Sequence, residues 1–308
     1  MVRDVHLERL ADYANPDLDA LTGRLLELAG CRPARGEHVL VKPNLVAPAN
    51  TSLSCTHPAV VRAACRYLVD HGAAVTVGDS PAFGSGRAVA RACGLDKALA
   101  GLPVRLTNFT KPRQIPLSLG GSIGVASQAL DASFIVNVPR FKVHDQMLLT
   151  LAVKNFFGCV AGFRKALAHQ IHGEKGNRFE SMILDVCLAM PPSVSLVDGV
   201  VAMHVCGPAK GKPYPLGLLG AAASPIALDA ALHAVLGLAV DATPLGREAA
   251  RRKLAWDVAY RLRRPEEFDA RGFLLPRAMA HVAFKPARFF KGRLKSLYVR
   301  LCGGGSRI

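Results

Sequence analysis

The stretch SFIVNVPRFKVH (residues 133–144) joins a run of apolar and β-branched residues to a polar end. Short apolar runs of this kind are typical of strands that lie buried in a parallel sheet. The same pattern recurs in HVLVKPN (38–44), AAVTVGDSP (73–81) and VSLVDG (194–199). The sequence therefore predicts four buried strands, each with polar residues at its carboxyl end.

Helical patterns separate these strands along the chain. The predicted helices are 56–72, Ser85–Cys93, Gln146–Phe156, Arg178–Met190 and Pro225–Leu236. Alternation of strand and helix predicts an α/β fold with a mainly parallel sheet flanked by helices. In such sheets ligands bind beyond the carboxyl ends of the strands, so the polar residues there become candidates for a functional site.

Composition indicates a globular protein. The chain has 308 residues, of which 50% are hydrophobic and 20% charged, a length that suits one large domain with an extension. We expect an α/β core over residues 1–244 and a helical, basic C-terminal extension over 245–308. The first residues, MVRDVHLERLADY, do not resemble a signal peptide, and the chain lacks an apolar run of about 18 residues, so we expect a cytoplasmic protein.

The net charge of +16 is concentrated near the C-terminus, where residues 245–308 carry 16 Lys and Arg against 5 Asp and Glu. Segment 286–308 has the pattern of a basic amphipathic helix. Three uses of it remain open: binding an anionic membrane surface, binding an acidic protein, or packing on the core with a solvated basic face. Nucleic acid is disfavoured as a partner, because no recognition motif accompanies the charge.

Cationic side chains gather at the predicted carboxyl ends. In an extended 140–144 segment, Arg140, Lys142 and His144 share one face because side chains alternate along a strand. On the predicted helix that follows, Gln146, Thr150 and Lys154 form one polar stripe.

We expect these groups to bind a small anion, with Lys42 beside them. The expected catalytic residues are Lys142, His144, Lys154, Asp79 and Asp198. The expected substrate-binding residues are Lys42, Asn44, Ser80, Arg140, Thr150 and Asn155. A purely structural role remains the alternative for each, because Asp79 or Asp198 could pair with the lysines and Lys154 could interact with a helix dipole.

The sequence gives weaker evidence for a metal site or a reactive thiol. The eight cysteines include no CxxC pair, so no iron–sulfur motif is present, and a nucleophilic role for Cys159 is less favoured than burial in the core. His169 and His172 could share a helix face as ligands for a divalent metal, but no acidic motif accompanies them. The cofactor is left unknown.

Seven motifs occur in an order that resembles one family, domain of unknown function 362. They are VKPNLVAP with THPAVVRA, VGDSP, NVPRFKVH, LAVKNFFGCV, KALAH, LVDGVVAM and GPAKGKP. The resemblance covers about residues 38–237. It implies a fold distantly similar to nickel-dependent lactate racemase and a family that is widespread in anaerobes and often associated with iron–sulfur clusters. The ferredoxin-like cysteine module of many members is missing from this chain.

Two functions follow as expectations. The first is an enzyme that acts on a small carboxylate or phosphate metabolite by proton or group transfer. The second is a redox-associated or cofactor-handling accessory protein, recruited to a partner or a membrane periphery by its basic C-terminal helix.

Overall fold

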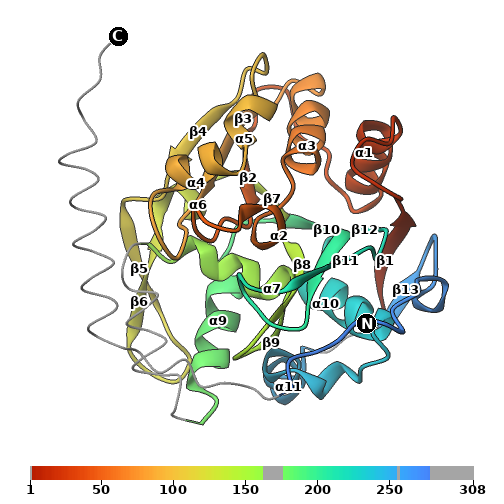
Figure 1. Ribbon diagram of the computed structural model, residues 1–308. Coiled ribbons are helices and arrows are strands. Elements are labelled where there is room, and N and C mark those ends of the chain that lie inside the picture. The colour runs from red at the N-terminus through yellow and green to blue at the C-terminus, as the bar shows by residue number, and fades with distance from the viewer. Residues whose placement is uncertain (1, 162–175, 255–256, 278–308) are drawn as a thin grey trace.

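A large mixed sheet forms the centre of the molecule. The computed structural model describes residues 2–161, 176–254 and 257–277. Within these residues an 11-stranded sheet has the order β13-β1-β12-β10-β7-β2-β3-β4, with β8, β9 and β11 attached beside β10 (Figure 1). The strands from β10 to β4 run parallel, whereas β12 is antiparallel to both of its neighbours. The predicted α/β fold with a mainly parallel sheet is confirmed.

The strand bounds agree with the apolar runs of the sequence. The central strands are β2 (His38–Pro43), β3 (Ala74–Asp79), β4 (Arg105–Asn108), β7 (Phe134–Val138), β8 (Arg140–His144) and β10 (Ser193–His204). The strands on the other side are β1 (Val2–Arg9), β11 (Lys212–Tyr214), β12 (Leu218–Ala222) and β13 (Asp257–Tyr260). A separate hairpin joins β5 (Pro112–Pro116) to β6 (Ser122–Ala126).

Pro139 divides the predicted strand 133–144 into β7 and β8. Proline has no backbone N–H and so cannot donate to a neighbouring strand. Its carbonyl oxygen still accepts a hydrogen bond from the amide of Asp198, at 2.9 Å. As a result, β7 lies between β2 and β10, while β8 pairs only with β10 and β9. Strand β10 continues to His204, beyond the predicted end at residue 199, because β8 and β11 pair with its second half.

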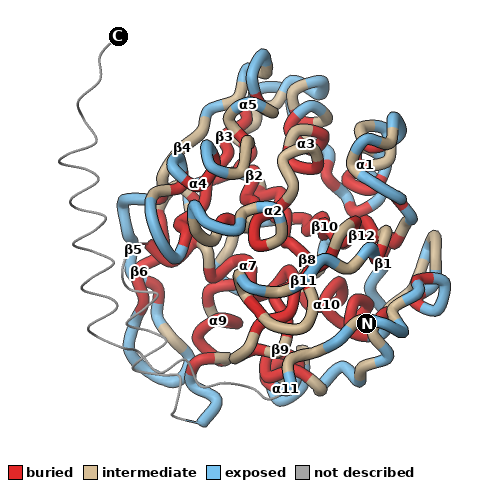
Figure 2. Tube along the Cα trace, in the orientation of Figure 1, coloured by how far each residue is buried: buried red, intermediate tan, exposed pale blue. Residues whose placement is uncertain are grey.

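Helices cover both faces of the sheet. In Figure 2 the strands are mostly buried, and the helices around them are partly exposed. Side chains alternate along β2, so Val39 and Val41 pack with one set of helices while Leu40 faces the other. The first set includes α1 (Leu18–Leu28), α3 (Pro58–Asp70), α4 (Gly86–Ala92) and α5 (Leu95–Ala98). The second includes α6 (Ser127–Leu130), α7 (Ala152–Asn155), α9 (Arg178–Leu188) and α10 (Pro225–Val235).

The predicted helix over 146–156 is wrong. Residues Leu148–Thr150 form strand β9, which pairs antiparallel with β8, and only Ala152–Asn155 are helical before a 3-10 turn over Phe156–Cys159. Two contacts explain this. The Nδ1 atom of His144 accepts from the amides of Gln146 and Met147, which closes the hairpin turn. The carboxylate of Asp229 accepts from the first helical amides, at 2.7 and 3.2 Å, and so sets the helix start at Ala152.

A strand near the end of the described chain joins the edge of the main sheet. Helix α11 (Pro244–Arg251) is followed by β13, which pairs parallel with β1 at the edge of the sheet. The predicted boundary after residue 244 stays a prediction. The predicted basic helix of 286–308 lies outside the described residues. Within them, no helix combines the length and the apolar character that crossing a bilayer requires.

Candidate functional site

Charged side chains of neighbouring strands form ion pairs, β2 with β3 and β8 with β10. The parallel register places Val41 of β2 beside Val77 of β3, and β8 follows β7 directly at the same edge. The chain thus delivers Lys42, Asp79, Arg140, Lys142 and Asp198 to a common region, where all five are buried. Burying this much charge is costly unless the groups satisfy one another.

Lys42 and Asp79 form the first buried ion pair. The Nζ atom of Lys42 lies 3.0 Å from Oδ1 of Asp79, with the side chains 0% and 1% exposed. The carboxylate also accepts from the amides of Leu45 and Ser80, both at 2.8 Å. Gly158 packs directly against the pair, where a Cβ atom would collide with both charged groups. Lys42 is therefore engaged with Asp79, and the two strands are locked together at their ends.

Arg140 and Asp198 form the second buried ion pair, with side chains 1% and 0% exposed. Tyr13 bridges them, because its hydroxyl donates to Asp198 Oδ1 at 2.8 Å and accepts from Arg140 at 2.7 Å. The amide of His57 donates to Asp198 Oδ2 at 2.8 Å, and the His57 ring stacks on Tyr13 at 3.6 Å between centroids. The guanidinium of Arg140 also donates to the carbonyl oxygen of Val201.

Sequence reasoning missed Tyr13 and His57. Tyr13 lies in the connection between β1 and α1, far along the chain from Asp198, and no local pattern marks it. Burial next to the carboxylate of Asp198 raises the pKa of the Tyr13 hydroxyl, so the phenol stays protonated and can donate. Burial also lowers the pKa of His57, against the opposing effect of Asp198.

A chain of amide side chains connects the strands beneath these pairs. Asn44 donates to Asn155 at 2.8 Å, and Asn155 donates to Asn137 at 2.7 Å. Asn137 in turn donates to Ser195 Oγ at 3.0 Å. Because a buried amide is expensive to leave unsatisfied, this chain fixes the orientation of Asn44.

Asn44 presents its side-chain oxygen to Lys142, whose ammonium donates to that atom and to the carbonyl oxygen of Ser54. No carboxylate within the described residues forms an ion pair with Lys142. Burial lowers its pKa to about 7, and the positive charges of Lys154 and Arg140 act in the same direction. The buried amine therefore gives up its proton more readily than an ordinary surface lysine does.

Thr150 and Lys154 lie next to Lys142, although the predicted helical stripe is absent. Lys142 and Thr150 are directly opposite each other in the β8–β9 ladder and so share a face. The Thr150 hydroxyl is buried and has no hydrogen-bond partner in the part of the chain that the structure describes. Lys154 is 8% exposed, and its positive charge lowers the pKa of Lys142.

His144 is held by its own turn. Its Nδ1 atom accepts from the amides of Gln146 and Met147, at 3.1 and 3.3 Å, which places the proton of the neutral ring on Nε2. Asp79 and Asp198, two of the expected catalytic residues, form ion pairs with Lys42 and Arg140. Ser80 is buried and donates its amide to Asp79 and to the carbonyl oxygen of Gly158.

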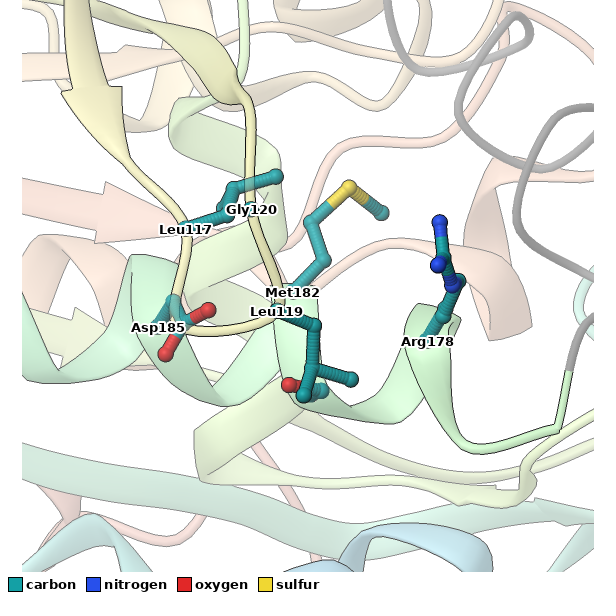
Figure 3. Close-up of a pocket in the computed structure, with 7 residues that line it drawn as sticks. Leu117, Leu119, Gly120, Arg178, Met182 and Asp185 are labelled. Atoms are coloured by element: carbon teal, nitrogen blue, oxygen red, sulfur yellow. The ribbon is translucent and has the colours of Figure 1, made fainter.

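Two hollows in the described surface lie away from this region. A small cavity of about 10 Å³ is lined by Leu117, Met182 and Asp185, with Arg178 at its rim (Figure 3). A larger one of about 450 Å³ lies by the N-terminal strand, between His6, Ser224 and Arg261. Neither is lined by a predicted site residue.

Within the described ranges, no group of three or more His, Cys, Asp or Glu side chains could hold a metal ion. His169 and His172, the predicted candidates for metal binding, lie outside the described residues. Cys159 is buried, as expected for a core thiol.

Known proteins that are similar to this chain include a curated relative and two solved structures. The chain is 33% identical over 312 residues to the thylakoid-associated protein sll1697 of Synechocystis sp., a match that covers 97% of this chain and 96% of that protein. The lactate racemase apoprotein of Thermoanaerobacterium thermosaccharolyticum matches with a TM-score of 0.46 at 10% identity, over 72% of this chain and 54% of that one. A protein of Thermotoga maritima matches with a TM-score of 0.40 at 15% identity, over 60% and 50%.

The chain thus spans about half the length of these two solved structures. The model of the family called domain of unknown function (DUF362) matches residues 39–234. This range contains β3, β7, β8 and β10, all of β2 except His38, and both buried ion pairs. The predicted resemblance is confirmed, and this protein belongs to the DUF362 family.

Proposed function

We propose that the protein is an enzyme that acts on a small anionic metabolite, a carboxylate or a phosphate, bound by Lys142, Thr150 and Lys154. The observation that carries the proposal is the buried Thr150 hydroxyl, which has no hydrogen-bond partner among the described residues and belongs to the residue opposite Lys142. Native proteins seldom leave such a group unsatisfied, so a ligand oxygen is its natural partner. Asn44, which accepts a hydrogen bond from Lys142, is partly exposed.

The residues divide into two roles under this proposal. Lys154 would supply positive charge for the anion, and Thr150 would donate a hydrogen bond to it. Lys142 would exchange a proton with the substrate, because a pKa of about 7 makes both of its protonation states available at neutral pH. His144 is a second candidate for proton exchange, through Nε2. The two ion pairs would position these groups without touching the substrate.

The test begins with identifying the ligand. Native mass spectrometry of the full chain, purified without oxygen, would reveal a small anion, metal or cluster that co-purifies. Thermal-shift assays with inorganic phosphate and acetate would then compare wild type with Lys142→Ala and Lys154→Ala. Lys97→Ala, at an exposed position on α5, is the matched control.

The proposal expects a melting-temperature increase with at least one anion in wild type and the control, and none in the two site variants. When a substrate is found, both site variants should lose turnover while remaining folded. Equal anion responses in all four proteins, or full activity in both site variants, would refute it.

A second candidate function is that of an accessory protein at a membrane periphery. The observations in its favour are the printed name of the relative, a thylakoid-associated protein, and the basic excess of residues 245–308. A polybasic amphipathic segment gains binding energy from anionic lipid headgroups. Flotation with vesicles that contain anionic lipid should recover wild type but not a chain that lacks 286–308. Equal recovery of both would remove this candidate.

A further inference from the structure

The larger hollow, of about 450 Å³, lies beside β1 and has the size of a small-molecule site. Its walls come from the start of β1, the end of α1, the turn between β12 and α10, and the residue that follows β13. These parts of the chain lie on one side of the molecule (Figure 1). None of the described residues that line the hollow belongs to the candidate site around Lys142.

Two helix ends of opposite polarity border the hollow. Residues 28–30 form the C-terminal end of α1, where the last carbonyl groups of a helix lack partners within it. Ser224 is the N-cap of α10, at the end where backbone N–H groups are left over. The helix dipoles therefore give the hollow one border of partial negative charge and one of partial positive charge.

Charged side chains of both signs also line the hollow. Arg3 and Arg261 are positive, and Asp4 is negative. The Nε atom of Arg261 donates to Asp4 Oδ1 at 2.9 Å, and the two side chains are 57% and 51% exposed. Because this ion pair is open to solvent, both of its charges can be reached by a molecule that enters the hollow.

His6 supplies a buried polar group in the wall of the hollow. Its side chain is 4% exposed, and its Nδ1 atom has no hydrogen-bond partner among the described residues. Burial lowers the pKa of His6, against the opposing effect of Asp4, so the ring is neutral at pH 7. With its proton on Nε2, the neutral ring accepts a hydrogen bond at Nδ1. Buried ring nitrogens are seldom left unsatisfied, so a ligand N–H is the natural partner of this one.

Large apolar side chains complete the lining. Val2 and Leu28 are 61% and 45% exposed, which is unusual for residues of their size, and both border the hollow. Ala29 and Ala223 add further apolar surface. An apolar group on the ligand would remove this surface from water and so add to its affinity.

We propose that this hollow binds a free α-amino acid with an apolar side chain. The ammonium of the amino acid meets Asp4, the Nδ1 atom of His6 and the carbonyl end of α1. The carboxylate meets Arg261 and the N-terminal end of α10, and the apolar side chain packs on Val2 and Leu28. A ligand with both charges uses both borders, whereas a simple anion would leave the negative one opposed. The site is independent of the proposed enzyme function.

Isothermal titration calorimetry of the full chain tests the proposal with leucine, methionine and phenylalanine at millimolar concentrations. An amino acid that binds is compared with two analogues, one without its ammonium and one without its carboxylate. For leucine these are isocaproate and isopentylamine. We expect at least one amino acid to bind and both of its analogues to bind at least about 10-fold more weakly, because each loses hydrogen bonds to a charged group.

Two arginine variants locate the binding. Arg261→Gln should weaken binding by at least about 10-fold, because the carboxylate loses a charged donor. The matched control is Arg263→Gln, which breaks a similar ion pair, with Glu8, outside the hollow and should bind as wild type does. Lys142→Ala should also bind normally, which separates this hollow from the candidate site.

The comparison of analogues uses wild type, so a folding defect in a variant cannot obscure the answer. No binding of any of the three amino acids at millimolar concentrations would overturn the proposal. Equal affinity for an amino acid and either analogue would also overturn it, since a ligand with both charges would then have no advantage. The same holds if Arg261→Gln and Arg263→Gln bind alike, or if Lys142→Ala abolishes binding.

Discussion

Replacing Lys142 with methionine tests the unusual ionisation of this buried amine. Methionine keeps most of the side-chain volume and removes the charge. The substitution leaves Asn44 Oδ1 and the carbonyl oxygen of Ser54 without their donor, at a cost of about 1 to 3 kcal/mol that does not depend on pH. Removing the buried charge instead raises the stability of the folded protein, by an amount that changes with pH.

The magnitude follows from the pKa of Lys142, which falls from 10.5 to about 7 on folding. Between these values the unfolded lysine binds a proton that the folded one does not, so the free energy of unfolding rises with pH. Each pH unit well inside this range is worth about 1.4 kcal/mol. From pH 7 to pH 9, wild type should gain about 2 kcal/mol of stability relative to Lys142→Met.

Urea denaturation at pH 7, 8 and 9 measures this difference. Groups other than Lys142 titrate in both proteins, so the gap between the two stability curves isolates the lysine. Lys97→Met, at an exposed position, should run parallel to wild type. Parallel curves for wild type and Lys142→Met would refute the reasoning, because they would mean that folded Lys142 keeps its proton throughout.

Three further substitutions test the packing around the site. Gly158→Ala places a Cβ atom against Asp79 and Lys42 and should lower the free energy of unfolding by about 2 kcal/mol or more in urea titrations. Asp198→Asn leaves a buried guanidinium without its counter-charge and should cost about 3 to 5 kcal/mol by the same measurement. Thr150→Val removes a hydroxyl that has no partner in the described part of the chain and should stabilise the ligand-free protein by about 1 kcal/mol, while calorimetry should show weaker phosphate binding. A destabilised Thr150→Val protein with unchanged phosphate affinity would contradict the last expectation.

The parallel sheet could be predicted from the sequence because each of its central strands is marked by a pattern of neighbouring residues. Each central strand is a short apolar run with a polar end, and β2 and β3 match their predicted segments within one or two residues. The face shared by Arg140 and Lys142 also follows from local alternation, and Phe141 and Val143 pack in the core as that alternation requires.

The turn after His144 could not be predicted in the same way. Gln146, Thr150 and Lys154 have helical spacing, but the helix start depends on Asp229, which lies far along the chain. Lys154 nevertheless lies close to Lys142, because the hairpin of β8 and β9 brings α7 back towards the same edge.

The partners of the charged groups depend on long-range contacts. Sequence reasoning treated Arg140 and Lys42 as donors for a substrate, but Asp198 and Asp79 occupy them as buried pairs. Tyr13 completes the Arg140 pair from the other end of the chain, with no local signal. The expectation of a cationic cluster was thus informative about place, while the coordinates were needed to show which of the cations form buried ion pairs.

The most direct test of the account is to locate a bound anion. Crystals of the full chain, soaked in bromide at pH 6 so that Lys142 is protonated, would give anomalous diffraction from each bound ion. The account predicts a bromide within hydrogen-bonding distance of the Thr150 hydroxyl and the Lys142 ammonium. Bromide found only on the outer surface, with the Thr150 hydroxyl bonded to a protein atom, would contradict it.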